Sequence, residues 1–195
     1  DLWGKKIKVT GNYGYTKNTN LGLVNRVRDF VTADQSDVSY QENSRDVRTS
    51  QRHTANLRLE YSPNEKNKIL YIPRLEANVE TENSSFFGQT NNGINPINQV
   101  DNQRTGTYKE VDFFNRLIYS HKFDKPGRSL TWRSILHQGF DRDVSDRIAN
   151  TTYFQPSGNR TDVLAQQTSR ERIGTRWETG LSFTEKIGKA GQLEI

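Results

Sequence analysis

Apolar and polar residues alternate with a period of two over much of this chain, and no other feature constrains its fold as strongly. The run 54–61 reads TANLRLEY, so its apolar side chains project to one side of an extended strand. Similar alternation recurs in the runs 5–15, 68–81, 110–123, 130–141 and 170–187. A helix would instead return an apolar residue every three to four positions. The pattern predicts an all-β chain whose strands each have one apolar face.

Turn signals divide these runs in a regular way. Short polar segments with Pro, Asn or Gly open at Ser62, Asp124 and Gly188, and these residues favour tight reversals. Polar stretches without periodicity separate the hairpins, and we expect long loops near 19–50, 83–107 and 150–166. Short turns that alternate with long loops are typical of bacterial outer-membrane barrels. The whole chain, 1–195, is therefore expected to be one partial transmembrane β-barrel domain.

The expected topology is an antiparallel up-and-down meander in a curved single sheet. About six complete strands and the start of a seventh fit the spacing of the turns. Several runs continue for roughly 14–18 residues, whereas about 9–11 suffice to cross a bilayer, so we expect the strands to project beyond the membrane. Pro73 lies inside one run. Because proline lacks a backbone N–H, we expect a bulge or a weak pairing there.

Composition agrees with a sheet that buries little. Hydrophobic residues make up 31% of the chain, below the roughly 45–50% of globular domains, yet aromatic residues make up 10%, which argues against disorder. A barrel with a polar lumen needs an apolar residue only at alternate positions. The chain has no apolar run long enough for a transmembrane helix. Its net charge of +5 comes from arginines interleaved with acidic residues, so nucleic acid is not an expected partner.

Aromatic residues gather near the short turns. Rings at one level of a barrel form a girdle at the membrane interface. The alternative is the ordinary preference of aromatic residues for strands. The girdle that we expect consists of Trp3, Tyr61, Tyr71, Tyr119, Phe123, Trp132 and Phe183.

Charged residues of both signs occupy the face opposite the apolar one. In one interpretation they form cross-strand ion pairs inside a hydrated barrel. In another they form a polar wall along which a plug packs or a solute passes, and both roles can hold together. The expected lumen-facing residues are Arg58, Arg74, Glu76, Glu80, Asp112, Arg116, Arg133, Arg172, Arg176 and Glu178.

Catalytic and metal-binding patterns are absent from the sequence. The three histidines, His53, His121 and His137, have no ligand-spaced partner, and the chain has no cysteine. Carboxylates at 141, 143, 146 and 162 could bind a hard cation, but a solvated strand end is the favoured interpretation. We therefore expect no enzyme activity, no cofactor and no metal.

Two stretches resemble a known family. The segment 113–130 reads FFNRLIYSHKFDKPGRSL and the segment 53–61 reads HTANLRLEY. They resemble the TonB-dependent-receptor-like outer-membrane β-barrel family of Bacteroidetes, in which a strand ends in a similar HKF-D-K-P-GR turn. The resemblance implies a Gram-negative outer-membrane location and a role in solute uptake. It also implies a barrel that follows a plug domain and a carboxypeptidase-regulatory-like domain.

The partners expected from this resemblance are outer-membrane lipid, the remainder of the barrel and its plug, with TonB and a surface lipoprotein as further candidates. A small, odd strand number cannot close a bacterial barrel, which has at least about eight strands, so we expect a fragment. The alternative is a soluble or surface-exposed β-sandwich that serves as a binding or adhesin module. In that case the apolar face would pack against a second sheet.

Overall fold

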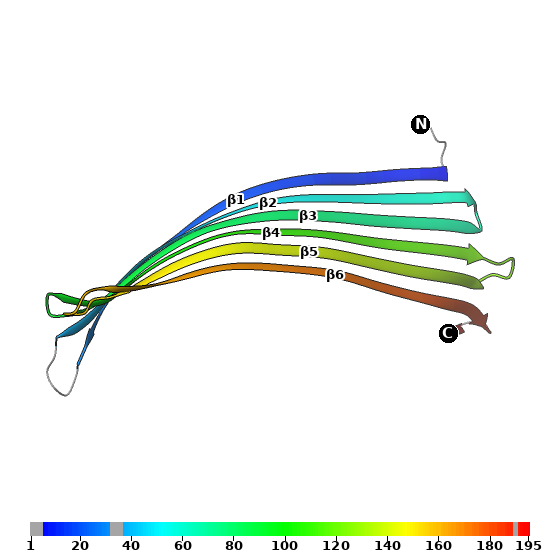
Figure 1. Cartoon of the computed structure of the whole chain (residues 1–195). Helices are drawn as coiled ribbons and strands as arrows, with labels where there is room; N and C mark the ends of the chain where they lie inside the picture. The colour runs from blue at the N-terminus through cyan, green and yellow to red at the C-terminus, as the bar shows by residue number, and fades with distance from the viewer. Residues whose placement is uncertain (1–5, 32–36, 189–190) are drawn as a thin grey trace.

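The computed structural model describes residues 6–31, 37–188 and 191–195, and they form one antiparallel sheet. Its seven strands are hydrogen-bonded in chain order, as an up-and-down meander (Figure 1). The predicted fold class is thereby confirmed. The strands are β1 (Ile7–Phe30), β2 (Val38–Asn64), β3 (Asn67–Asn92), β4 (Asn95–Lys122), β5 (Ser129–Tyr153), β6 (Arg160–Ile187) and β7 (Gly191–Glu194).

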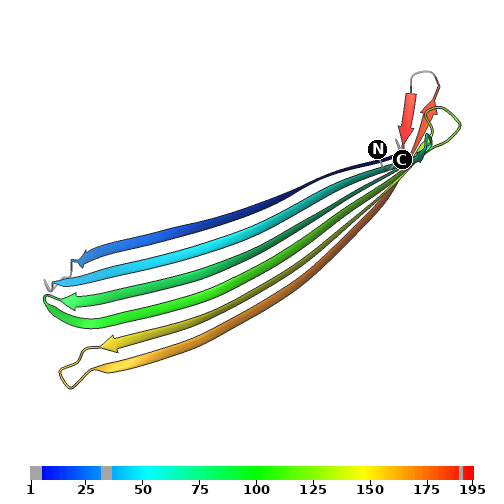
Figure 2. The ribbon, with the colours of Figure 1, turned by 90° about the horizontal axis from the view of Figure 1, so that it is seen from above.

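The sheet is a curved single layer that does not close on itself (Figures 1 and 2). Its accessible surface is 14284 Å², about one and a half times the roughly 9,500 Å² expected of a compact monomer of this mass. Among the described residues, Ala149 is the one buried hydrophobic side chain. The fold therefore has no core of its own, and its apolar side chains lie on its surface.

The expected loops near 19–50, 83–107 and 150–166 are wrong in extent. The six long strands contain 24 to 28 residues each, and most of these stretches are strand. The chain reverses between β3 and β4 at Gly93–Ile94, where Gly93 adopts a φ of 58°. Long and short connections therefore do not alternate strictly. Alternation marks a strand with one apolar face. These stretches carry mostly polar residues on both faces, their apolar residues such as Leu21 and Val24 fall on either face, and they need only backbone hydrogen bonds to form a ladder.

Pro73 weakens one ladder without shifting it. Its pairing with Asn115 of β4 is in register. Towards β2, the paired positions stop at Asn56↔Arg74 and resume at Leu59↔Tyr71 with the same register. The expected weak pairing is present, but no bulge accompanies it.

The reversal after β4 follows the predicted Pro-Gly turn. Gly127 has a φ of 80°, which only glycine adopts readily. A Cβ at this position would lie 2.8 Å from Cβ of Lys186, so a larger residue would also clash with β6. Glycine is therefore required at this turn for two independent reasons.

Register divides the side chains between two faces. Odd-numbered residues of β1–β4 lie on the same face as even-numbered residues of β5 and odd-numbered residues of β6. We call this the band face and the opposite one the polar face. The part of the chain that the structure describes holds no helix long and apolar enough to cross a membrane.

Candidate functional site

An apolar band crosses the band face of all six long strands. It begins near the short turns, where Tyr61, Ile69, Tyr119, Trp132 and Leu181 are successive register partners. It ends where Tyr15, His53, Ala77, Val111, Phe140 and Ile173 are aligned. The strand segments that contribute to it are 7–15, 53–61, 69–77, 111–121, 130–140 and 173–183. Beyond it lies the part of the sheet that we call the distal half, which is mostly polar on both faces but also exposes apolar residues such as Leu21 and Leu23 of β1.

The band is exposed, even in the middle of the sheet. Leu57, Leu75 and Val111 are 40%, 43% and 40% exposed although each has strands on both sides. Soluble monomers rarely expose a contiguous apolar patch of this kind unless it is an interaction site. The band is therefore a surface that requires an apolar partner.

Polar groups inside the band are hydrogen-bonded to one another. The hydroxyl of Tyr71 donates to Oδ1 of Asn115 at 2.6 Å. The indole N–H of Trp132 donates to Oγ1 of Thr179, and that of Trp177 to Oγ of Ser134, both at 2.9 Å. These pairs satisfy polar groups without water, which is what an apolar environment requires.

Asn115, Ser134 and Thr179 interrupt the apolar alternation, and the sequence interpretation did not assign them a role. The signal that could have identified them is register. Each of the two tryptophans bonds a hydroxyl residue on the neighbouring strand, so the interruptions occur where an aromatic residue with an N–H or O–H lies nearby.

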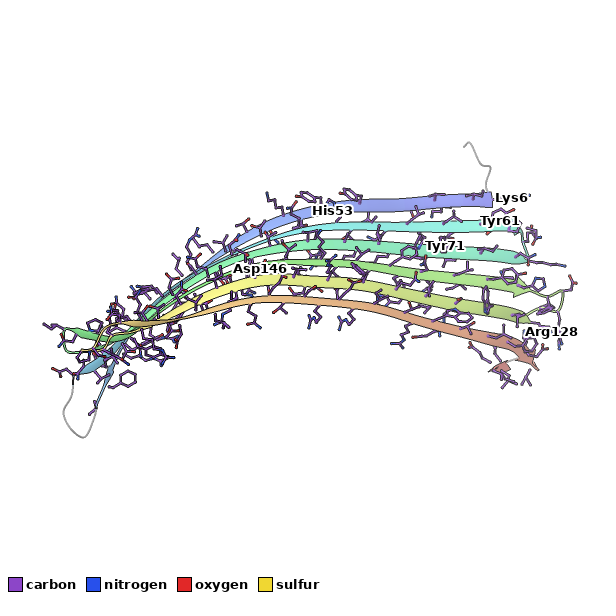
Figure 3. The ribbon with its side chains drawn as sticks, viewed as in Figure 1. Lys6, His53, Tyr61, Tyr71, Arg128 and Asp146 are labelled. Atoms are coloured by element: carbon purple, nitrogen blue, oxygen red, sulfur yellow. The ribbon has the colours of Figure 1, made fainter. Side chains whose placement is uncertain are left out.

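The residues predicted for the aromatic girdle lie on the band face at its short-turn edge, except that Trp3 lies outside the described residues. Tyr61, Tyr119 and Trp132 belong to one register row, and Phe183 pairs with Leu130. The rings of Phe123 and Phe183 are 6.3 Å apart. Tyr71 lies one row farther from the turns, as Figure 3 shows relative to Tyr61. The six described residues are thus spread over neighbouring rows near the short turns and do not share a single level.

All ten predicted wall residues lie on the polar face, at register positions between those of the band. Several form ion pairs there: Arg74 with Glu76 at 2.9 Å, and Arg172 with Asp141 at 2.7 Å. The guanidinium of Arg116 lies 5.7 Å from the centre of the Phe114 ring. The Nε of Arg116 is buried and has no hydrogen-bond partner among the described residues.

A hollow of about 290 Å³ opens on the polar face over Gly139 and Gly174, which are register partners on β5 and β6. Asp112 and His137, which are 3.1 Å apart, and the Asp141–Arg172 pair line it. A second hollow of about 360 Å³ shares Asp112 and His137 and extends to Arg74 and Arg116. Carboxylates and guanidinium groups here present both hydrogen-bond donors and acceptors to a polar molecule.

The remaining candidate metal ligands, the histidines and aspartates, are divided between the two faces of the sheet. His53 and His121 lie on the band face, where His53 bonds the hydroxyl of Tyr13 at 2.6 Å. Asp141 and Asp143 lie on the polar face, but Asp146 is on the opposite one. The described residues contain no group of three or more His, Asp or Glu side chains arranged to hold a metal ion.

Ion pairs join the short turns to one another, and the sequence interpretation missed them. Lys66 of the first turn bonds Asp124 of the second. Lys125 and Arg128 both bond Glu185 at the end of β6. Hydrogen bonds from Arg128 and Lys125 lower the pKa of Glu185 to about 2. The hydrogen bond from Lys66 likewise lowers the pKa of Asp124.

No family model matches this chain, and no curated protein matches it at a significant level.

Proposed function

We propose that this sheet is part of the wall of a transmembrane β-barrel in a bacterial outer membrane. In this proposal the band faces lipid and the polar face lines the lumen. The observation that carries it is that the band segments of all six long strands end at one register row and begin within one row of each other. Each strand contributes the length that crosses a bilayer, about 9–11 residues at a tilt of about 45°.

The dimensions support this assignment. Along β4 the band runs from Val111 to His121, which is about 34 Å of strand at roughly 3.4 Å per residue. At a tilt of about 45° this gives a height of about 24 Å, close to the apolar band of about 25 Å on known barrels.

The open edges of the sheet support a barrel that is completed by further strands. β1 pairs on one side only, and β6 pairs with β7 over four positions only. Unpaired backbone groups in lipid cost several kcal/mol each, so further strands are needed to cover them. The β-sandwich alternative instead requires a second sheet over the band. The described residues form one sheet, and they supply no such second layer.

Within this class, we propose solute uptake in a barrel similar to TonB-dependent receptors. The resemblance of 53–61 and 113–130 to that family supports it, as do the hollows on the polar face. The distal half supports it as well: the 95–110 part of β4 extends about 50 Å beyond the band. The partners would be the remaining strands and a plug, with TonB and a surface lipoprotein as further candidates.

Lipid exposure is tested by tryptophan fluorescence. The protein encoded by the full reading frame is reconstituted into vesicles, with Trp3 and any tryptophan outside this chain replaced by Phe. Lipids brominated in their acyl chains should quench Trp132 and Trp177. In the matched control, Trp132→Phe and Trp177→Phe are combined with Phe114→Trp, which moves the reporter to the polar face. That variant should be quenched by aqueous iodide and spared by the brominated lipids. A detergent-free, soluble monomer with quenching by iodide alone would support the sandwich.

Uptake is tested in cells. Growth of a strain that lacks the reading frame is compared with that of its parent on single solutes. A Gly139→Phe variant fills the hollow over Gly139 while leaving the band face unchanged. It should reach normal levels in the membrane and lose growth on the same solute as the deletion. Normal growth of the deletion strain on every solute, or of the variant on the affected one, would count against the uptake role.

A further inference from the structure

A row of positive charges lies on the band face immediately beyond the band. One register row joins Lys17, Gln51, Val79, Lys109, Arg142 and Glu171. The side chains of Lys17, Lys109 and Arg142 are exposed. We call these three residues the basic row.

The three cations of the basic row have no ion-pair partner among the described residues. Lys109 and Arg142 are direct register partners, which puts their Cβ atoms about 5 Å apart, and like charges in this position repel. Glu171 is the other register partner of Arg142, yet within the described chain no ion pair joins any member of the row to an acidic residue. By contrast, many arginines of the polar face have a carboxylate partner, such as Arg172 with Asp141.

A row of hydroxyl groups follows the basic row. The next aligned positions on the band face are Thr19, Thr49, Thr81, Thr107, Val144 and Ser169, and all of them except Val144 carry a hydroxyl. The hydroxyls of Thr19 and Thr49 are 3.1 Å apart. Cations and hydroxyl donors therefore lie at successive levels, just beyond the end of the band.

The opposite edge of the band differs in chemistry. Aromatic residues dominate there, and its cations Lys125 and Arg128 are already paired with Glu185. Among the described residues of the band face, cations without an ion-pair partner therefore border the band at its distal edge and not at its short-turn edge.

We propose that the basic row, with the hydroxyl row beside it, binds the phosphate groups of anionic lipids in the leaflet at the distal edge. This inference rests on the proposed function, because it requires the band to lie in hydrocarbon. Phosphates lie just outside the hydrocarbon, at the level of the basic row. Each Lys or Arg close to an anionic membrane surface strengthens binding to that surface by about fivefold.

The test measures lipid composition beside the row. Cysteine does not occur in this chain, so a Val79→Cys variant of the full-length protein, with any other cysteine replaced, takes a single bimane label next to Lys109. The labelled protein is reconstituted into mixtures of phosphatidylglycerol and phosphatidylcholine. Bromine is placed on the acyl chains of one lipid or the other, and the two quenching curves give the local preference.

We expect phosphatidylglycerol to be preferred severalfold at low ionic strength, and the preference to fall as salt is raised. The variant Lys17→Gln/Lys109→Gln/Arg142→Gln should lose it. The control Arg28→Gln/Arg147→Gln/Arg170→Gln removes the same charge from the polar face of the distal half and should retain it. At matched ionic strength, inorganic phosphate should leave the preference unchanged.

Each contrary outcome has a separate meaning. Equal quenching by the two lipids, or equal loss in both triple variants, overturns the lipid-binding row, while quenching of Trp132 and Trp177 still supports the proposed function. Displacement by inorganic phosphate would assign the row to a free anion and overturn its assignment to lipid. If neither bimane nor tryptophan responds to brominated lipid, the proposed function fails as well.

Discussion

The same six strands behave as two different sheets along their length. In the band, one face is apolar and the other carries charges, so the two faces require different environments. In the distal half, both faces are mostly polar, and ion pairs such as Arg48 with Glu82 at 3.2 Å link neighbouring strands. A continuous backbone ladder joins the two halves. The difference shows that backbone hydrogen bonding makes the strand, whereas side chains determine what each part of the strand can contact.

Introducing an arginine into the band and into the distal half should give the largest difference in stability between the two halves. Leu57 lies in the middle of the band on β2, and Val47 lies on the same face of the same strand in the distal half. If the band lies in lipid as proposed, Leu57→Arg should lower the free energy of unfolding in vesicles by about 2–4 kcal/mol, the cost of an arginine at the bilayer midplane. Val47→Arg should change it by less than about 1 kcal/mol. Equal losses in urea titrations of the two variants would break the distinction between the halves.

Removing an ion-pair partner on the polar face, where the band meets the distal half, should have an intermediate effect on stability. Asp141 is buried, at 7% exposure, and accepts a hydrogen bond from Nε of Arg172 at 2.7 Å. Arg172→Ala leaves this carboxylate without its partner, and we expect a loss of roughly 1–3 kcal/mol. Arg160 bonds the exposed Asp162 in the distal half at 3.0 Å, and Arg160→Ala should cost about 0–1 kcal/mol. Denaturant unfolding compares the two, and a larger loss in Arg160→Ala would contradict the ranking.

Hydrogen bonds between side chains should also differ between the halves. A double-mutant cycle with Trp177→Phe and Ser134→Ala should give a coupling of about 0.6 kcal/mol, typical of such bonds in membranes. The hydroxyls of Thr152 and Thr161 are 3.1 Å apart in the distal half. Because water competes with this pair, the Thr152→Val/Thr161→Val cycle should give a coupling near zero. A stronger coupling in the distal pair would show that the band is the more hydrated region.

The smallest effect is expected at the short turns, as a dependence on pH. Glu185 has a pKa of about 2 in the folded protein, below its ordinary value of 4.5. A carboxyl group with a lowered pKa stabilises the fold above its unfolded pKa, and this stabilisation is lost as pH falls from about 4.5 towards 2. Unfolding midpoints of the parent should therefore decrease more steeply over this window than those of Glu185→Gln. Parallel curves would show that the ion pairs with Lys125 and Arg128 do not stabilise the turn region.

The two halves also differ in how far their structure could be predicted from sequence. Alternation in runs such as 54–61 predicts the strands of the band and the face of each side chain, because one face there is apolar. The same criterion fails at 83–107, where Ser, Thr, Asn and Gln occupy both faces of β3 and β4. The distal strands form because each pairs with at least one neighbouring strand. That pairing cannot be detected within a short window of sequence.

The sites follow the same logic. The nine wall residues from Arg58 to Glu178, with Glu80, were predicted on one face because period two fixes the parity within each strand. The basic row escaped prediction because Lys17, Lys109 and Arg142 come from three strands, and only the register of those strands aligns them. The ion pairs of Glu185 escaped for a similar reason, since Lys125 and Arg128 belong to a different hairpin.

The order of the strands has a consequence for how such a sheet can change. Every strand neighbours its predecessor in the chain, so a hairpin is a self-contained unit of the sheet. Excision of β3 and β4 would bring β2 beside β5 with antiparallel direction retained, and duplication of a hairpin would likewise preserve direction. A gene that encodes this topology can therefore widen or narrow its product by whole hairpins, without rethreading any part of the polypeptide.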